Sequence, residues 1–367
     1  MLPDAALASP PPDGYRMTFI DGLRGIACLS VVVCHFLVPG ISQIATRLQD
    51  ALPKFLVTVL RHGELGVEIF FVLSGLVIAY SLRNRPLGTR FLWRFAARRA
   101  IRLDPPYHLT LCVMAAQAAW LLPDTFCQLG PWFGGTPGVW ANVFYLQDIL
   151  RQPHILSIAW TLCLEIQFYL ALVLLVWLAQ ALRRWLQRHQ AWHPGPLAFT
   201  LVFGPLAVLS IISWFPSLSN FTFLGTWFRF FLGVVTWWAM EGRIRKEIPG
   251  ILILVLLVLG CYTVDPRSIV AALTALLILV SHARGSLSRW LGAPFWQFLG
   301  RISYSLYLVH FMVAIPLTNW LWTLGPPSPA MAVILFGAGT ALSILTAWLF
   351  YCYIERPSIA LSRTISY

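Results

Sequence analysis

An arginine and a histidine in the first long apolar segment are spaced to share one face of a helix. Arg24 and His35 are eleven residues apart. Eleven helical steps of about 100° complete three turns plus about 20°, so both side chains point the same way, roughly 16 Å apart along the axis. Ionisable groups inside an apolar segment are costly and usually functional. A cation and a titratable base at this separation suit a long anionic donor whose reactive end must reach the base.

Three further titratable residues fall in apolar segments, namely Glu68, Glu165 and His310. When the segments are numbered from an N-terminus inside the cell, these residues and His35 lie in the middle to outer half of the membrane. A carboxylate beside a histidine fixes its tautomer and tunes it as a general base. We therefore expect His35 to be the base, oriented by Glu165 or Glu68. Mutual neutralisation is the alternative, and His310 is equally well explained as a hydrogen-bonded interior histidine.

The composition excludes a soluble globular domain. Of the 367 residues, 58% are hydrophobic and 11% are charged, whereas soluble domains carry about 25% charged residues. Several uncharged runs approach about 20 residues, the length that crosses a bilayer. We predict an all-α, polytopic integral membrane protein with about ten transmembrane helices, whose spans are roughly 17–37, 65–82, 103–122, 156–182, 197–214, 221–240, 248–264, 269–282, 302–322 and 330–353.

The net charge of +12 is distributed as in a membrane protein rather than a nucleic-acid-binding protein. Nineteen of the 26 Lys and Arg residues fall in segments on the side of the N-terminus, and five fall on the other side. This asymmetry predicts that both termini are cytoplasmic. We expect a cytoplasmic segment at 1–16, one membrane domain at 17–355 with an outer loop at about 123–155, and a cytoplasmic tail at 356–367. The first span is expected to be retained, and no metal site is expected.

Two regions near the membrane surfaces have compositions that suit ligands. Arg94, Arg98 and Arg102 recur every four residues, so they form a basic stripe if this segment is helical. Guanidinium groups bind phosphate well, although a topology signal that contacts anionic lipid is the alternative. The outer loop holds Trp132 and Trp140 among glycines. Such a loop suits stacking on sugar rings, and an interfacial aromatic belt is the alternative.

Six segments, in this order, resemble the acyltransferase type 3 family of integral-membrane acyltransferases, which modify bacterial surface glycans and some small molecules. The segments are 21–25 with His35; 66–75 with Glu68 and Ser74; Arg98-Arg99 with Arg102-Leu103 and Pro106-Tyr107; Trp160-Thr161-Leu162 with Glu165 and Phe168-Tyr169; 302–308 with His310; and Glu355-Arg356-Pro357. The resemblance covers nearly the full chain. Two positions depart from the family pattern, because Glu68 stands where aspartate is usual and Ile166 replaces a second glutamate.

The resemblance implies an O-acyltransferase of the bacterial inner (plasma) membrane that uses acetyl-CoA, or another acyl-CoA, as a donor substrate and holds no permanent cofactor. We expect the donor to contact Arg24, Arg98, Arg99, Arg102 and Tyr107. Candidates for substrate contact or oxyanion stabilisation are Trp160, Ser74, Tyr304, His310, Trp132 and Trp140. The expected acceptor is a hydroxyl of a glycan, such as exopolysaccharide, O-antigen or lipo-oligosaccharide, or of a lipid-linked sugar. Direct transfer and relay through an acylated His35 both remain open.

Two other classes of protein are alternatives to an enzyme. A polytopic transporter also uses buried Arg, His and Glu in proton relays or substrate paths. Its expected signature is a pair of internal repeats with matching broken helices, and none is apparent in the sequence. A non-catalytic membrane scaffold has no use for a cation and a base on one helix face. The sequence therefore favours an enzyme.

Overall fold

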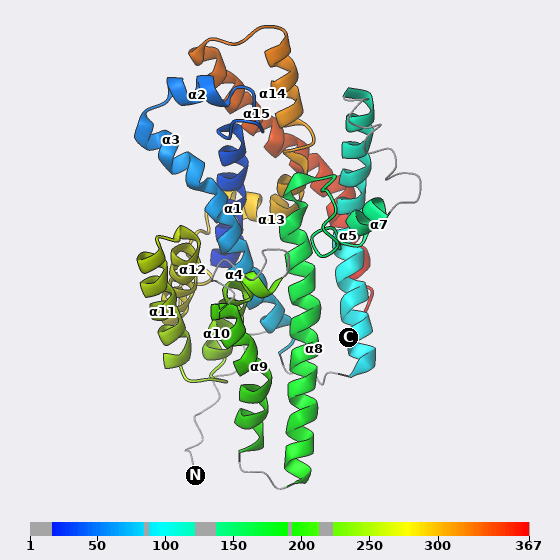
Figure 1. The fold of residues 1–367 in the computed structure, drawn as a ribbon, viewed down its shortest axis with the longest axis vertical. Helices are drawn as coiled ribbons and strands as arrows, with labels where there is room; N and C mark the ends of the chain where they lie inside the picture. Colours follow the sequence, from blue (N-terminus) through cyan, green and yellow to red (C-terminus); the bar gives the residue numbers. More distant parts are fainter. Residues whose placement is uncertain (1–16, 84–87, 122–136, 190–192, 213–222, 367) are drawn as a thin grey trace.

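The computed structural model describes residues 17–83, 88–121, 137–189, 193–212 and 223–366, and within them all regular secondary structure is helical. Figure 1 shows the helices as an elongated bundle in which α1 and α13 lie near the centre. The longer helices are α1 (Thr18–Phe36), α4 (Gly66–Ser81), α5 (Thr89–Leu121), α8 (Trp160–Arg188), α9 (Pro194–Ile212), α10 (Trp227–Met240), α11 (Glu247–Thr263), α12 (Pro266–Ala283), α13 (Pro294–Val309), α14 (Ala314–Thr323) and α15 (Pro329–Phe350). Shorter helices are α2 (Ala45–Ala51), α3 (Lys54–Arg61), α7 (Pro137–Val143) and α16 (Arg356–Ser362).

Five helical stretches of the described chain are long and apolar enough to cross a membrane, namely Thr18–Phe36, Lys54–Ser81, Ser157–Arg188, Pro266–Ala283 and Pro329–Ser362. A sixth arises if α13 and α14, which meet at an angle of 48°, are counted as one span. Every one of the ten predicted spans overlaps a helix. The structure therefore confirms an all-helical, polytopic arrangement, and the number ten stays a prediction.

Two predicted spans differ from the helices that occupy them. The predicted span 302–322 is broken between α13 and α14, because the helix stops at Val309 although the sequence stays apolar. The predicted span 103–122 is the second half of α5, which begins at Thr89 and carries the basic segment in the same helix. Pro105 and Pro106 lie inside α5 without ending it.

Glycines let the central helices approach one another closely. A Cβ atom on Gly25 of α1 would lie 2.9 Å from the backbone nitrogen of Gly300 in α13. Similarly, a Cβ on Gly75 of α4 would overlap the Phe230 carbonyl of α10, and one on Gly233 would overlap the Val72 carbonyl. Small residues allow such backbone contact between helices in membranes. These contacts place α1, α4, α10 and α13 side by side, and the charged residues of the site lie on these helices and on α5 and α8.

Asn142, which is fully buried, fastens the segment after α7 to α5. Its side-chain amide donates to the carbonyl oxygens of Gly138 and Pro153, and its side-chain oxygen accepts from the backbone N–H of Ile155. The Tyr107 hydroxyl of α5 donates to the Asn142 carbonyl at 2.9 Å. This network fixes the chain that leads into α8. Most of the predicted outer loop, including Trp132, lies outside the described residues.

The contact between α4 and α10 predicts that Gly233→Ala is destabilising. The added methyl group overlaps the Val72 carbonyl, and overpacking of this kind costs about 1–3 kcal/mol or more. The matched control is Gly337→Ala in α15, where a Cβ meets open space and alanine is the better helix former by up to about 1 kcal/mol. Thermal unfolding in detergent should show a lower Tm for Gly233→Ala only. Equal Tm values for the two variants would contradict the packing described here.

Candidate active site

Five helices enclose a cavity of about 90 Å³, which we call the arginine cavity. Three arginines line it, namely Arg24 of α1 and Arg99 and Arg102 of α5. Its remaining polar and aromatic lining comes from α4, α8 and α13 and comprises Ser74, Thr161, Glu165, Tyr169, Ser303, Tyr304, Tyr307, Phe70 and Phe71. Arg24, Arg99 and Arg102, which the sequence predicted as donor ligands, are therefore brought together.

Two arginines of α5 line the cavity, and Arg98 of the same helix does not. Arg99 and Arg102 are three residues apart and so share a face of α5. Arg98 is four residues before Arg102 and lies beside it on the surface of α5, but its side chain is not part of the cavity lining. The Arg99 guanidinium lies 4.3 Å from the centre of the Tyr169 ring, a cation–π contact that fixes its position at the cavity.

Glu165 contributes the one carboxylate among the described lining residues. It accepts a hydrogen bond from the Ser74 hydroxyl at 2.6 Å, and the Tyr169 hydroxyl donates to Ser74 at 3.3 Å. Three guanidinium groups therefore face one carboxylate, so the lining carries an excess of positive charge. The buried Nε of Arg24 has no hydrogen-bond partner among the described residues. A buried donor without a partner is costly, so the cavity suits an anionic group.

Glu355 forms a second carboxylate site behind the cavity. This buried residue lies at the end of a π-helical turn, Tyr351–Glu355, and accepts from both the backbone N–H and the hydroxyl of Ser305. Arg24 and Arg102 lie within electrostatic range of it. Glu355 belongs to one of the six family motifs, but the sequence analysis assigned no role to it. Its position at the end of an apolar span was the signal that it must be paired inside the protein.

His35 and His310 form a stacked pair between α1 and the end of α13. Their ring centres are 5.1 Å apart, and His35 Nδ1 lies 3.1 Å from His310 Nε2. His310 Nδ1 lies 3.0 Å from the Leu306 carbonyl, to which it can only donate. When both rings are neutral, His310 Nε2 therefore accepts from His35 Nδ1. This arrangement leaves the lone pair of the half-buried His35 on Nε2, as a general base requires.

The histidine pair lies outside the arginine cavity, and Tyr307 stands between the two. The Tyr307 ring lines the cavity, and its centre is 6.2 Å from that of His310. Its hydroxyl lies 2.7 Å from both the Thr161 hydroxyl and the Ile158 carbonyl. The structure therefore does not bring His35 together with Glu165, although the two residues were predicted at a similar depth.

Glu68 is paired with Arg229, which was not among the predicted site residues. Its carboxylate lies 3.2 Å from Arg229 Nη1 of α10, and both side chains are buried. In the described structure the hydrogen-bond partner of His35 is His310, and neither Glu68 nor Glu165 takes that place. An arginine within the apolar run Trp227–Met240 was the available signal, because such a charge needs a buried partner.

The remaining predicted site residues lie in other surroundings. Trp160 is 39% exposed and packs edge-on against Phe71, outside the cavity lining. The Tyr304 hydroxyl donates to the Leu103 carbonyl at 2.8 Å. Tyr107 is held by Asn142 and stacks on Tyr145, away from the arginines. Trp140 is 56% exposed on α7.

Comparison with known families matches the chain to the acyltransferase 3 family, described as "Acyltransferase domain", over residues 17–352. The chain belongs to this family. It is therefore a membrane O-acyltransferase, as the order of its motifs predicted. The match includes every residue that lines the arginine cavity and both histidines.

Individual relatives are distant. Acyltransferase MdmB of Streptomyces mycarofaciens is 26% identical over 331 residues, which cover 83% of this chain and 80% of that protein. O-acetyltransferase OatA of Staphylococcus aureus is 23% identical over 376 residues, covering 92% of this chain and 56% of that protein. Peptidoglycan O-acetyltransferase OatA of Listeria monocytogenes is 28% identical over 167 residues, covering 41% of this chain and 22% of that protein. The match thus spans only part of either OatA protein. No solved structure matches the chain.

The pair formed by Glu68 and Arg229 predicts a rescue experiment in this acyltransferase. Arg229→Met strands a buried carboxylate, and breaking such a pair costs about 3–5 kcal/mol. The double variant Glu68→Leu/Arg229→Met removes both charges, so Tm should recover most of the loss and acyl transfer should return with it. If the double variant were as unstable as Arg229→Met, the pair would not be the cause. If stability returned without activity, Glu68 or Arg229 would act in the chemistry itself.

Proposed function

We propose that the acyltransferase moves an acetyl or other short acyl group from an acyl-CoA to a hydroxyl of a glycan, such as exopolysaccharide, O-antigen or lipo-oligosaccharide, or of a lipid-linked sugar. The observation that supports this most is the convergence of Arg24, Arg99 and Arg102 on one cavity with a single carboxylate in its lining. Charge-assisted bonds from guanidinium groups are the usual means of holding phosphate. Family membership favours acyl transfer over the alternative of a transporter.

The arginine cavity is assigned to a phosphate-bearing part of the donor. A volume of about 90 Å³ is well below the roughly 300–1,000 Å³ of pockets that enclose a whole small molecule. The cavity therefore takes one anionic group, and the thin thioester arm extends along α1 toward His35. The roughly 16 Å between Arg24 and His35 along the helix is the length that this arm must cover.

His35 is assigned the role of general base, with His310 as the residue that positions it. His35 Nε2 takes the proton of the acceptor hydroxyl, and the resulting alkoxide oxygen bonds to the thioester carbonyl carbon. The carbon–sulfur bond then breaks, and the departing thiolate takes the proton from the imidazolium. Among the three predicted oxyanion donors, Ser74 and Tyr304 already donate to Glu165 and to the Leu103 carbonyl. Trp160 is therefore the candidate whose indole N–H would bind the oxyanion.

The membrane placement that we propose has ten spans, both termini in the cytoplasm and the acceptor on the outer side of the plasma membrane. It is supported by the overlap of each predicted span with a helix and by the excess of basic residues on one side. In this orientation Arg24 lies toward the cytoplasm, where acyl-CoA is made, and His35 lies toward the acceptor. One chain therefore connects a soluble donor with an exported sugar.

His35→Ala should abolish turnover without preventing donor binding. Positioned general bases contribute about 10²–10⁴ to rate, so release of free thiol from acetyl-CoA in the presence of acceptor should fall at least about a hundredfold. The donor dissociation constant should stay within about threefold. His189→Ala is the control, because His189 is exposed near the far end of α8. Near-normal thiol release by His35→Ala would exclude His35 as the base, whether or not the arginine cavity binds the donor.

Arg102→Gln should instead weaken donor binding. Loss of a charge-assisted hydrogen bond costs about 1.5–3 kcal/mol, which corresponds to a rise in the dissociation constant for acetyl-CoA of about ten- to a hundredfold. Arg90→Gln makes the same change at an exposed position of α5 outside the cavity and should leave the constant nearly unchanged. Calorimetric titration of both purified variants measures the difference. Equal affinities would remove the arginine cavity from donor binding.

A further inference from the structure

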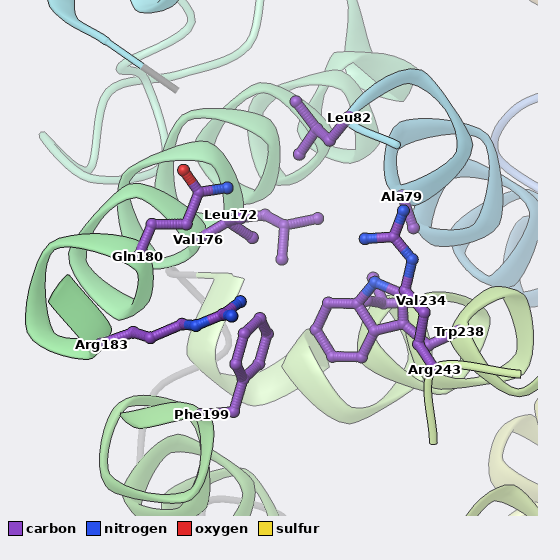
Figure 2. A pocket seen from close by; sticks show the side chains of 10 residues that line it. All are labelled: Ala79, Leu82, Leu172, Val176, Gln180, Arg183, Phe199, Val234, Trp238 and Arg243. Carbon is purple, nitrogen blue, oxygen red and sulfur yellow. The ribbon is translucent and has the colours of Figure 1, made fainter. Parts of the chain in front are cut away.

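A second and larger cavity, of about 320 Å³, lies between α4, α8, α9 and α10 (Figure 2). Its walls are mainly apolar and include Leu172 and Val176 of α8, Phe199 of α9 and Trp238 of α10. It shares no lining residue with the arginine cavity and lies farther along α4 and α8. Its volume falls at the lower end of the roughly 300–1,000 Å³ typical of ligand pockets. We call it the α8–α10 cavity.

Two arginines face each other across this cavity. Figure 2 shows Arg183 reaching in from α8 and Arg243 facing it from the segment after α10, with Gln180 beside Arg183. The Nε of Arg243 lies 2.6 Å from Glu241, which anchors this guanidinium at the cavity. Arg183 forms no hydrogen bond or ion pair with another described residue, and no described lining residue is acidic. Glu241 balances the charge of Arg243, so Arg183 gives the polar side of the cavity its excess positive charge.

The residues around Arg183 have the composition expected at the boundary of a membrane. Trp185 is 53% exposed only two residues farther along α8, while Leu174 and Leu178 are exposed on the preceding turns. A tryptophan that follows exposed leucines is typical of the headgroup region. Arginines near helix ends also act as topology signals and contact terminal carbonyls. Those roles do not account for an apolar cavity between the two guanidinium groups.

We propose that the α8–α10 cavity binds an anionic phospholipid of the cytoplasmic leaflet. The lipid phosphate lies between Arg183 and Arg243, and one acyl chain lies along the apolar walls. Basic pockets between transmembrane helices on the cytoplasmic side are suited to lipid phosphates, and guanidinium forks bind phosphate oxygens with two donors. A soluble anion would make no contact with the apolar walls, and a lipid without net charge would leave the excess positive charge of the cavity unbalanced. The bound lipid joins α8 and α9 to α4 and α10.

Native mass spectrometry of the purified full chain with added phosphatidylglycerol or phosphatidylcholine of equal chain length tests the proposal. Wild type should retain one phosphatidylglycerol more strongly than phosphatidylcholine. Arg183→Gln/Arg243→Gln should bind phosphatidylglycerol at least about tenfold more weakly. The control, Arg184→Gln/Arg188→Gln, removes the same charge from exposed positions of α8 outside the cavity and should bind like wild type. Equal binding by the two double variants, whether weakened or unchanged, would overturn the proposal.

Competition separates a lipid from a soluble phosphate at this cavity. Neither inorganic phosphate nor acetyl-CoA should displace the retained phosphatidylglycerol. Displacement by either one would overturn the lipid assignment in favour of a soluble phosphate or nucleotide ligand. Arg183 and Arg243 are exposed, and loss of the partly exposed ion pair of Arg243 with Glu241 costs only about 0–1 kcal/mol. Without added lipid, the two double variants should have similar Tm values. A loss of lipid binding in one of them then reflects the cavity and not unfolding.

Discussion

Charged side chains inside apolar helices must be neutralised, and the way this chain neutralises them determines where a ligand can bind. An unpaired charge in a dehydrated interior costs several kcal/mol. Glu68 is paired with Arg229, and Glu355 accepts two hydrogen bonds from Ser305. The arginines around Glu165 are the exception, because three guanidinium groups share a cavity with one carboxylate. Glu355 also lies within electrostatic range of Arg24 and Arg102, so three guanidinium groups face two carboxylates in this part of the interior. The remaining positive charge supports the proposal that an anionic group binds where the five helices meet.

Close helix contacts make this arrangement possible. Gly25 lets α1 approach α13, and Gly75 and Gly233 bring α4 against α10. The close approach of α4 and α10 also brings Glu68 of α4 within 3.2 Å of Arg229 of α10. The same helices carry residues of both halves of the site, since α1 holds Arg24 and His35, and α13 holds Tyr307 and precedes His310. The glycines therefore have two effects, because the close helix contacts that they allow also bring ionisable residues of neighbouring helices together.

The sequence predicted the helices and the faces of the helices well, because apolar runs and the helical repeat are local properties. Arg24 and His35 do lie on one helix, and the basic segment with Arg94, Arg98 and Arg102 is helical, although Arg99 and not Arg98 lines the cavity beside Arg102. Contacts between residues of different helices could not be predicted from these local properties. Depth in the membrane suggested that Glu165 accompanies His35, whereas Glu165 bonds to Ser74 and His35 bonds to His310. The break after Val309 was also hidden, because the residues on both sides of it are apolar.

The histidine pair lies at the end of α13, immediately before that break. His310 follows the last residue of α13, its ring is anchored on the Leu306 carbonyl, and the chain then turns by 48° into α14. His310 keeps helical backbone angles and its N–H bonds to the Leu306 carbonyl, so the last turn of α13 holds its ring beside His35, with an angle of 24° between the two ring planes. The two rings then share one hydrogen bond, which leaves His35 Nε2 as the basic atom. Tyr307, one turn earlier, separates this atom from the arginines through its bonds to Thr161 and Ile158. Tyr307 thus contacts both halves of the proposed site, because it lines the arginine cavity and its ring centre is 6.2 Å from that of His310.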